Sequence, residues 1–129
     1  TNVLLKARLD AVADLQKREL LCCNVGDSAV LVVDPLDRQR LGYASTDHRL
    51  HSNQEEQTRV LATGARLAYA MDPITKMPAG SLRLWPGGLA MSRAIGDGDC
   101  GALVLCEPAF CSVKVPAEGA VAVACSDGV

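Results

Sequence analysis

Two aspartates follow short apolar segments, and each has a glycine beside it. The first lies in Asn24-Val25-Gly26-Asp27-Ser28 and the second in Ala124-Cys125-Ser126-Asp127-Gly128. A carboxylate at the end of a strand is held by a rigid element while it still faces a cleft, and hard divalent cations prefer oxygen ligands of this kind. Glycine lets the neighbouring backbone take angles that other residues avoid. The pattern therefore suits a divalent metal site.

Each aspartate taken alone has a simpler interpretation. Gly-Asp and Asp-Gly pairs are common in ordinary turns, so spacing alone favours a turn at both places. Asp27 and Asp127 are far apart in the sequence, and only the fold can bring them together. The metal and turn interpretations both stay open on the residues alone.

Other catalytic patterns fail on inspection. Asp97-Gly98-Asp99 lacks the glycine and the distal glutamate at the offsets of a calcium loop. Glycine-rich phosphate-binding motifs are absent from the sequence. No serine lies in a nucleophile-elbow pattern, so a Ser/His/Asp triad is not supported.

Three basic side chains have competing interpretations. His48, beside Asp47, is expected to be a hydrogen-bonded loop residue, and His51 is expected to be exposed at a helix start. Arg93 is able to bind a phosphate with two parallel hydrogen bonds. It is equally able to hold a neighbouring loop through backbone carbonyl groups, and the residues alone do not decide between these roles.

Short strands are the main elements expected to position these residues. Residues 20–25 and 29–33 are apolar runs around a Gly-Asp turn and predict a β-hairpin. Residues 89–95 are expected to form a strand. Residues 110–115 alternate in polarity and predict another strand, and the apolar run 120–125 predicts a buried one.

One helix has clear end signals. Ser52-Asn53-Gln54-Glu55 has the form of a capping box, and Gly64 is a left-handed stop after a helix that runs to about Thr63. Residues 1–19 have apolar side chains at helical spacing, so we expect a helix there, with a strand as the alternative. Residues 65–88 are expected to be irregular because prolines and glycines interrupt them. These elements predict an α+β domain.

Composition excludes several classes of protein. The chain has 129 residues, of which 49% are hydrophobic and 3% aromatic, and its formal net charge is -2. The absence of a basic stripe argues against nucleic acid, and no apolar run approaches the ~20 residues of a membrane span. No signal peptide is expected, because charged residues interrupt the early apolar stretch. The six cysteines are expected to be reduced core thiols of an intracellular protein.

Read in order, a series of motifs resembles one protein family. The motifs are Asn24-Val25-Gly26-Asp27-Ser28, Ser45-Thr46-Asp47-His48-Arg49, Glu55/Glu56 with Arg59-Val60 and Gly64-Ala65, Leu89-Ala90-Met91-Ser92-Arg93-Ala94-Ile95-Gly96-Asp97, Glu107-Pro108, and Ala124-Cys125-Ser126-Asp127-Gly128-Val129. The ordered set is similar to the metal-dependent protein phosphatases of the type 2C serine/threonine class. The segment Trp85-Pro86-Gly87-Gly88 looks most like plant or algal members.

The resemblance implies a fold and a domain organisation. Residues 1–129 would be a partial catalytic domain, with the matching region at about 20–129 and a variable flap at 66–88 beside the active site. The implied fold is part of a four-layer α/β/β/α sandwich, in which two antiparallel sheets are flanked by helices. The complete protein would be a monomer that acts on phosphoproteins, not on nucleic acid or membranes.

The resemblance also implies a chemistry. Two or more Mg²⁺ or Mn²⁺ ions would activate a water that hydrolyses phosphoserine and phosphothreonine, without a covalent phosphoenzyme. Asp127, Asp27 and Gly128 match metal-site positions. Positions expected to give structural support to the site are Arg93, Ser92, Asp97 and Gly26. No residue of this chain matches a catalytic acid or base, and the choice between Mg²⁺ and Mn²⁺ stays open.

Several family features are missing from this sequence. The Asp-Gly-His-Gly-Gly motif, an upstream phosphate-binding arginine and the later Trp-Asp and Asp-Asn pairs are absent, and Ala29 stands where many members have arginine. We therefore expect this chain alone to be inactive, as a fragment of an active enzyme. The alternatives are a catalytically dead pseudophosphatase that acts as a binding or regulatory module, and an unrelated small α+β interaction domain. Retention of both Asp27 and Asp127 favours the enzyme over the pseudophosphatase.

Overall fold

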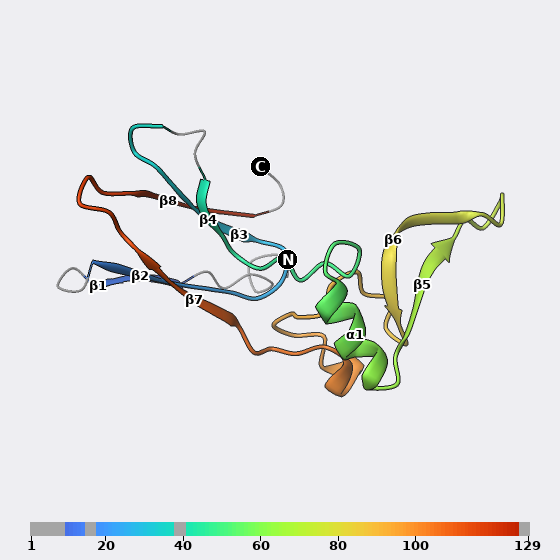
Figure 1. The fold of residues 1–129 in the computed structure, drawn as a ribbon. Helices are drawn as coiled ribbons and strands as arrows, with labels where there is room; N and C mark the ends of the chain where they lie inside the picture. Colours follow the sequence, from blue (N-terminus) through green and yellow to red (C-terminus); the bar gives the residue numbers. More distant parts are fainter. Residues whose placement is uncertain (1–9, 15–17, 38–40, 127–129) are drawn as a thin grey trace.

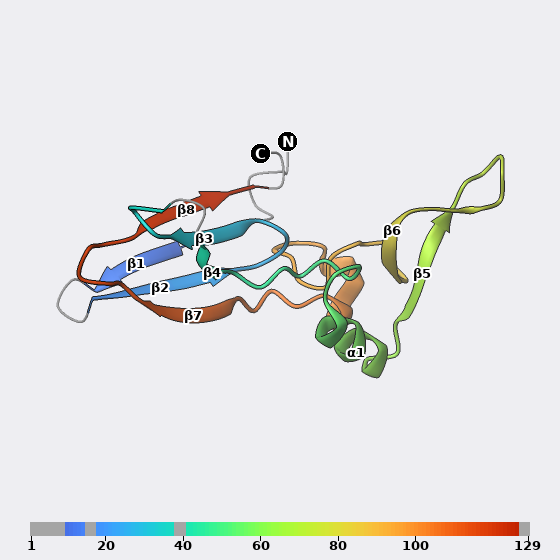
Figure 2. The same cartoon turned by 45° about the horizontal axis from the view of Figure 1, so that its top comes forward.

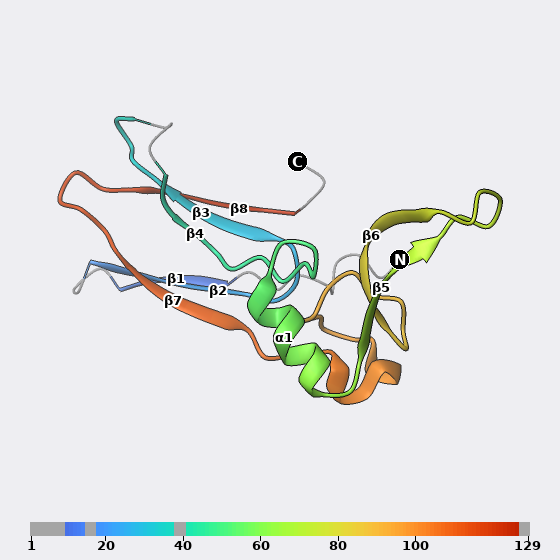
Figure 3. The same cartoon turned by 45° about the vertical axis from the view of Figure 1, so that its right-hand side comes forward.

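Two three-stranded antiparallel sheets form one part of the molecule, and a helix and a long hairpin form the other (Figure 1). The computed structural model describes residues 10–14, 18–37 and 41–126. One sheet has the strand order β1 (Asp10–Asp14), β2 (Glu19–Asn24), β7 (Ala109–Lys114), and the other has β4 (Leu41–Ala44), β3 (Ala29–Val33), β8 (Val121–Cys125). The two sheets are stacked face to face (Figures 1 and 3). The predicted α+β class and the sheet sandwich are confirmed.

The core between the sheets explains how β2 and β3 are connected. Leu20 and Cys22 of β2 pack with Val30 and Val32 of β3 in one buried cluster. The two strands belong to different sheets and do not pair with each other, so the predicted hairpin is wrong. Both strands carry a buried side chain at every second position, and all of these are apolar except Asn24 at the end of β2. That pattern is satisfied when the two rows face each other across a sandwich, and the connection is then an arch.

The helix expected at the N-terminus is also wrong where the structure describes it. Residues 10–14 form β1, which pairs antiparallel with β2 so that Ala11 lies opposite Cys22. The alternative strand interpretation holds there, since pairing with β2 satisfies the backbone groups on that side of β2. The rest of the predicted segment, residues 1–9 and 15–17, lies outside the described residues.

Helix α1 (Gln54–Ala62) begins one residue later than the capping box predicts. Asn53 is the N-cap, and its side-chain oxygen accepts the backbone N–H of Glu56 at 3.0 Å. Ser52 instead donates its hydroxyl to Asp47. The predicted end is confirmed, because Gly64 follows the cap residue Thr63 with a φ of 89°.

The segment predicted to be irregular contains a hairpin. Strands β5 (Arg66–Met71) and β6 (Pro78–Trp85) pair antiparallel, with a register shift between Tyr69 and Ala70. A two-stranded ribbon tolerates proline and glycine because each strand has a free edge. The hairpin projects from the molecule on the far side of α1 from the sheets (Figures 1 and 2). Its base joins a second core formed by Leu50, Val60, Ala65 and Leu84.

The segment between β6 and β7 makes only isolated contacts of the strand type. Single bridges join Arg49 to Met91 and Arg93 to Leu105, so the strand predicted for residues 89–95 is wrong. A 3₁₀ helix, η2 (Gly98–Leu103), follows. In place of a ladder, this segment satisfies its backbone groups with scattered long-range hydrogen bonds to the His48 loop and to Leu105.

The two C-terminal strands are confirmed, but β8 is not buried. Val121 and Val123 are 41% and 42% exposed. They lie opposite Val33 and Leu31 of β3, on the face of this sheet that points away from the core cluster. β8 is also an edge strand of its sheet.

None of the six cysteines lies in a disulfide in this structure, and only Cys22 and Cys100 are buried, so the expectation of core thiols holds for these two residues and not for the other four. No helix among the described residues is long and apolar enough to cross a membrane.

Candidate functional site

The arch between β2 and β3 carries Asp27 at the end of the sandwich nearest α1 (Figure 2). Asn24, the last residue of β2, is buried, and its amide donates to the carbonyl of Thr46 at 2.7 Å and to that of Ser28 at 3.4 Å. Gly26 has a φ of 97°, which a residue with a side chain rarely adopts. The buried amide and the glycine together fix the turn from which Asp27 projects.

His48 contacts the backbone of the arch at Gly26. Its side chain is fully buried, and its Nδ1 lies 3.1 Å from both the backbone nitrogen and the carbonyl oxygen of Gly26, within hydrogen-bond distance of each. The backbone N–H of His48 donates in turn to the carbonyl of Gly26 at 3.2 Å. The prediction that His48 is a hydrogen-bonded loop residue is confirmed, and His51 is exposed as predicted.

The charge state of His48 follows from its surroundings. Burial first, and then the positive charge of Arg93, lower the pKa of His48. The imidazole is therefore neutral at neutral pH, and its tautomer decides whether Nδ1 accepts the Gly26 N–H or donates to the Gly26 carbonyl, since both lie at 3.1 Å. Among the described residues Nε2 has no hydrogen-bond partner and is buried.

Asp27 itself lies on the rim of the molecule. Its side chain is 20% exposed, and its carboxylate lies 3.6 Å from the guanidinium of Arg49. The loop that carries Arg49 is fixed by Asp47, which accepts the N–H of Arg49 at 3.0 Å and the hydroxyl of Ser52 at 2.7 Å. The guanidinium compensates part of the negative charge of this carboxylate, so a cation at Asp27 competes with Arg49 for it, while an anion is able to bind Arg49.

Ser92 and Arg93 connect the His48 loop to α1. Both the backbone N–H and the hydroxyl of the buried Ser92 donate to the carbonyl of His48, at 2.9 and 3.1 Å. Arg93 donates to Oε1 of Glu56 through Nε at 3.1 Å and Nη2 at 2.6 Å, and to the carbonyl of Glu107 through Nη1 at 3.1 Å. All three guanidinium nitrogens of Arg93 thus form hydrogen bonds within the protein. Arg93 therefore holds neighbouring segments together in this structure and does not present a free guanidinium to a phosphate.

Glu56 is the residue that sequence reasoning missed. It is 5% exposed and shares its carboxylate between Arg93 and Arg59, whose Nε donates to Oε2 at 3.0 Å. Burial alone would raise the pKa of Glu56, but hydrogen bonds from Arg93, Ser92 and Arg59 outweigh it and hold this pKa at about 2. The spacing of Glu56 and Arg59 on one helix face was the only local signal for this network.

The remaining predicted positions are only partly described. Asp97 occupies the N-cap position of η2 with a φ of 50°, but its side chain makes no capping hydrogen bond, and its Oδ2 is buried without a hydrogen-bond partner in the described part of the chain. Asp127 and Gly128 lie outside the described residues. The described residues do not by themselves complete a metal site, because they contain no convergent group of three or more His, Cys, Asp or Glu side chains. Mg²⁺ and Mn²⁺ usually take about six oxygen ligands, and Asp27 offers one carboxylate.

The register of β3 and β8 is relevant to the predicted pair of metal-site aspartates, Asp27 and Asp127. Ala29 lies opposite Cys125 in an antiparallel ladder, and the thiol of Cys125 contacts the carbonyl of Ala29 at 3.8 Å. The chain therefore enters β3 next to the point where it leaves β8. Asp27 is two residues before Ala29.

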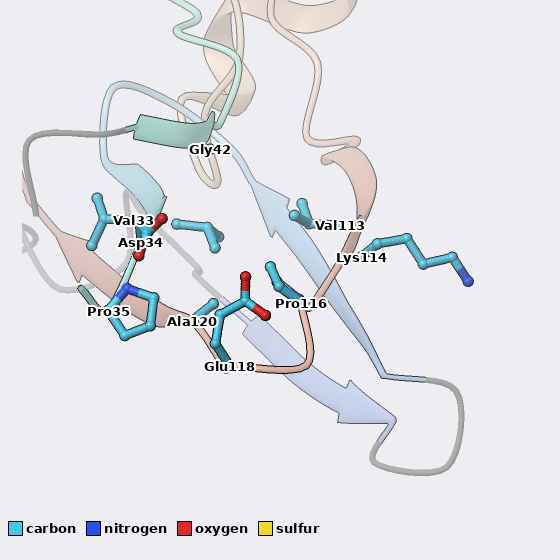
Figure 4. Close-up of a pocket in the computed structure, with 11 residues that line it drawn as sticks. Val33, Asp34, Pro35, Gly42, Val113, Lys114, Pro116, Glu118 and Ala120 are labelled. Atoms are coloured by element: carbon cyan, nitrogen blue, oxygen red, sulfur yellow. The ribbon is translucent and has the colours of Figure 1, made fainter. Parts of the chain in front are cut away.

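A pocket at the other end of the sandwich is separate from these residues. Its volume is about 210 Å³, and it opens between the two sheets where β3 ends and β8 begins. Figure 4 shows residues that line it, among them the apolar Val33 and Val113 and the acidic Asp34 and Glu118. None of the predicted site residues within the described part of the chain lines it.

Comparison with known proteins identifies a family that this sequence matches. Residues 8–129 match the family model described as protein phosphatase 2C. The chain is 39% identical over 106 residues to "Probable protein phosphatase 2C 69" of Oryza sativa subsp. japonica and, over the same length, to "Probable protein phosphatase 2C 12" of Arabidopsis thaliana. Each alignment covers 82% of this chain and 24% of the relative. The chain thus spans about a quarter of the length of these relatives.

Solved structures share the fold. A sex-determining protein of C. elegans superposes with a TM-score of 0.67 at 23% identity, over 86% of this chain and 24% of the other. The serine-threonine phosphatase 2C of Toxoplasma gondii gives a TM-score of 0.57 at 21% identity, over 88% of this chain and 38% of the other. The sandwich seen here is the fold of these proteins.

Proposed function

Because this chain belongs to the protein phosphatase 2C family, we propose that it supplies part of the active site of a protein serine/threonine phosphatase. The reaction is hydrolysis of phosphoserine and phosphothreonine in phosphoproteins. The complete protein acts inside the cell as a monomer, on protein and not on nucleic acid or membranes. The chain spans about a quarter of its curated relatives, so this activity belongs to the complete protein.

The pairing of Ala29 with Cys125 carries the proposal. Asp27 stands two residues before Ala29, and Asp127 stands two residues after Cys125. Strands paired in this way bring the residues before one strand and after the other toward the same end of a sheet. The register thus supports a common position for the two carboxylates, at the end of the sandwich that also holds His48 and Arg49.

In the proposed site, Asp127 and Asp27 provide oxygen ligands for Mg²⁺ or Mn²⁺, and Gly128 allows the backbone turn beside Asp127. Bound ions of this kind lower the pKa of a coordinated water and neutralise charge on a phosphoryl group. Gly26 supports the arch that carries Asp27. Ser92, Arg93 and Asp97 support the loop behind it, since Ser92 is bonded to His48 and Arg93 to Glu56. The β5–β6 hairpin is proposed to act as the flap that influences substrate choice.

The test is Mn²⁺- or Mg²⁺-dependent release of phosphate from a phosphothreonine peptide by the complete protein. Asp127→Ala is expected to lower kcat by at least 100-fold, and Asp27→Ala to raise the metal concentration needed for half-maximal rate. Asp37→Ala is the matched control, because this exposed carboxylate lies in the connection after β3, at the opposite end of the strand from Asp27. It is expected to leave both quantities unchanged.

Full activity in the Asp127→Ala variant would show that the proposed role of Asp127 is wrong. A complete protein that folds and binds no divalent ion would instead favour the pseudophosphatase, in which the same fold serves as a binding module.

A further inference from the structure

Two cysteines lie directly opposite each other in the first sheet. The antiparallel register of β2 and β7 pairs Cys22 with Cys111, between the pairs Leu20–Val113 and Asn24–Ala109. Leu20, Cys22 and Asn24 are the buried positions of β2. Cross-strand partners point to the same face of a sheet, so both thiols face the interior of the sandwich.

The spacing of such a pair suits a covalent bond. Directly opposed residues of antiparallel strands have Cα atoms about 4.5 or 5.5 Å apart, depending on the type of pair. Disulfides form across Cα separations of about 4.4 to 6.8 Å. The separation typical of directly opposed residues thus lies within the range that a disulfide spans, and the register places Cys22 and Cys111 in that relation.

The surroundings of the pair differ on its two sides. Cys22 is fully buried, whereas Cys111 is partly exposed. The Tyr43 hydroxyl is hydrogen-bonded to Cys111, and burial together with this bond raises the pKa of Tyr43 to about 12. The next inward residue along β7, Val113, lines the pocket between the sheets (Figure 4). A small oxidant thus reaches Cys111 more easily than Cys22.

We propose that Cys22 and Cys111 form a reversible intramolecular disulfide when the protein meets a peroxide. The Cys111 thiol loses its proton, its sulfur attacks one peroxide oxygen and the O–O bond breaks; Cys111 becomes a sulfenic acid, and the departing hydroxide takes up the released proton as water. The sulfur of Cys22 then attacks that of Cys111, the S–O bond breaks, and the departing hydroxide takes the thiol proton as water. In sum, two thiols and one hydrogen peroxide give one disulfide and two waters.

The bond would bear directly on the arch. Cys22 lies two residues before Asn24, whose amide fixes the turn that carries Asp27. A disulfide at this position ties the end of β2 to β7 covalently. Any effect of the disulfide on catalysis through Asp27 rests on the proposed function, whereas formation of the disulfide does not.

The test treats the protein with a small excess of hydrogen peroxide, alkylates the remaining thiols and maps crosslinked peptides by mass spectrometry without reduction. Tryptic digestion leaves Cys22 and Cys23 in one peptide, and Cys100, Cys106 and Cys111 in another. Variants are therefore needed to assign a crosslink to individual cysteines. We expect a crosslink between these two peptides in the wild-type protein and in Cys23→Ser. It should disappear in Cys22→Ser and Cys111→Ser, and dithiothreitol should reverse it.

Cys23 is the matched control because it is the neighbour of Cys22 but pairs with Phe110, so that its side chain points to the opposite face. A crosslink that is lost in Cys23→Ser and retained in Cys22→Ser would overturn the proposal. Oxidation of Cys111 to the sulfinic acid with no crosslink in the wild-type protein would overturn it as well.

Discussion

Replacement of Glu56 by glutamine removes the negative charge that two arginines share at the start of α1. The carboxylate accepts hydrogen bonds from Arg93 and Arg59 and is almost fully buried. The substitution keeps the size of the side chain and leaves both guanidinium groups partly buried without their counter-ion. The expected result is a large loss of stability from a change of one atom.

The magnitude follows from the pKa of Glu56, which is about 2 in the folded protein against an ordinary value of 4.5. One pKa unit corresponds to about 1.4 kcal/mol, so the charged form contributes about 3 kcal/mol. This agrees with the roughly 3–5 kcal/mol typical when one partner of a buried ion pair is removed. Since a glutamine oxygen still accepts a hydrogen bond, about 2–3 kcal/mol is the expected loss in the free energy of unfolding.

The pH dependence gives an independent check with a definite sign. A carboxyl group whose pKa is depressed in the folded state stabilises the protein fully above the unfolded value, near 4.5, and progressively less as pH falls toward about 2. The difference in stability between wild type and Glu56→Gln should therefore be constant from pH 7 to about 5 and shrink below that. At pH 2 most of the difference should be gone.

Urea titration followed by the fluorescence of Trp85, the single tryptophan of these 129 residues, measures these quantities. Glu55→Gln is the matched control, because Glu55 is the exposed neighbour in the same helical turn and should lose less than about 0.5 kcal/mol. Equal losses in the two variants at pH 7 would refute the argument. A Glu56→Gln deficit that persists undiminished at pH 2 would refute it equally.

Three further substitutions test the arch and the second core by the same urea titration. His48→Ala removes the buried ring that bonds the backbone of Gly26 and should cost about 2–3 kcal/mol. His48→Asn, whose side-chain amide can both donate and accept near the position of Nδ1, should recover part of that loss, and equal losses in the two variants would contradict the role of Nδ1. Gly26→Ala places a side chain at a φ of 97° and should cost about 1–2 kcal/mol, and a neutral result would contradict the strained turn. Leu84→Ala, at a fully buried position, should cost about 2–5 kcal/mol, while Leu36→Ala, 86% exposed, should cost almost nothing.

Strand positions were the part of the fold most open to prediction. Residues 20–25, 29–33, 110–115 and 120–125 each carried an apolar pattern, and each corresponds to a strand of the structure. What the pattern does not contain is the partner of each strand. Whether β2 and β3 form a hairpin or an arch depends on which sheet each joins, and that is decided by β7 and β8 from the other end of the chain. The prediction that β8 is buried was wrong for the same reason, because its position at the edge of a sheet is set by the pairing with β3 and not by its own residues.

The candidate site was predictable where its residues are local and not where they meet over long distances. Gly26 followed by Asp27 predicts a turn with unusual backbone angles, because glycine adopts a positive φ easily. Glu56 resembles any acidic residue at a helix start, and only the approach of Arg93 from a distant segment gives it another role. The cap shifted from Ser52 to Asn53 because two good capping residues adjoin and the hydroxyl of Ser52 is used by Asp47.

The arch has a mechanical consequence. Its two ends belong to opposite layers, so a slide of one layer over the other displaces the Asp27 side chain, and a ligand that holds this side chain resists the slide. By reciprocity the coupling has the same free energy in both directions. An ion bound at the rim should therefore slow amide hydrogen exchange in β2 and in β3 alike, although these strands share no hydrogen-bonded ladder.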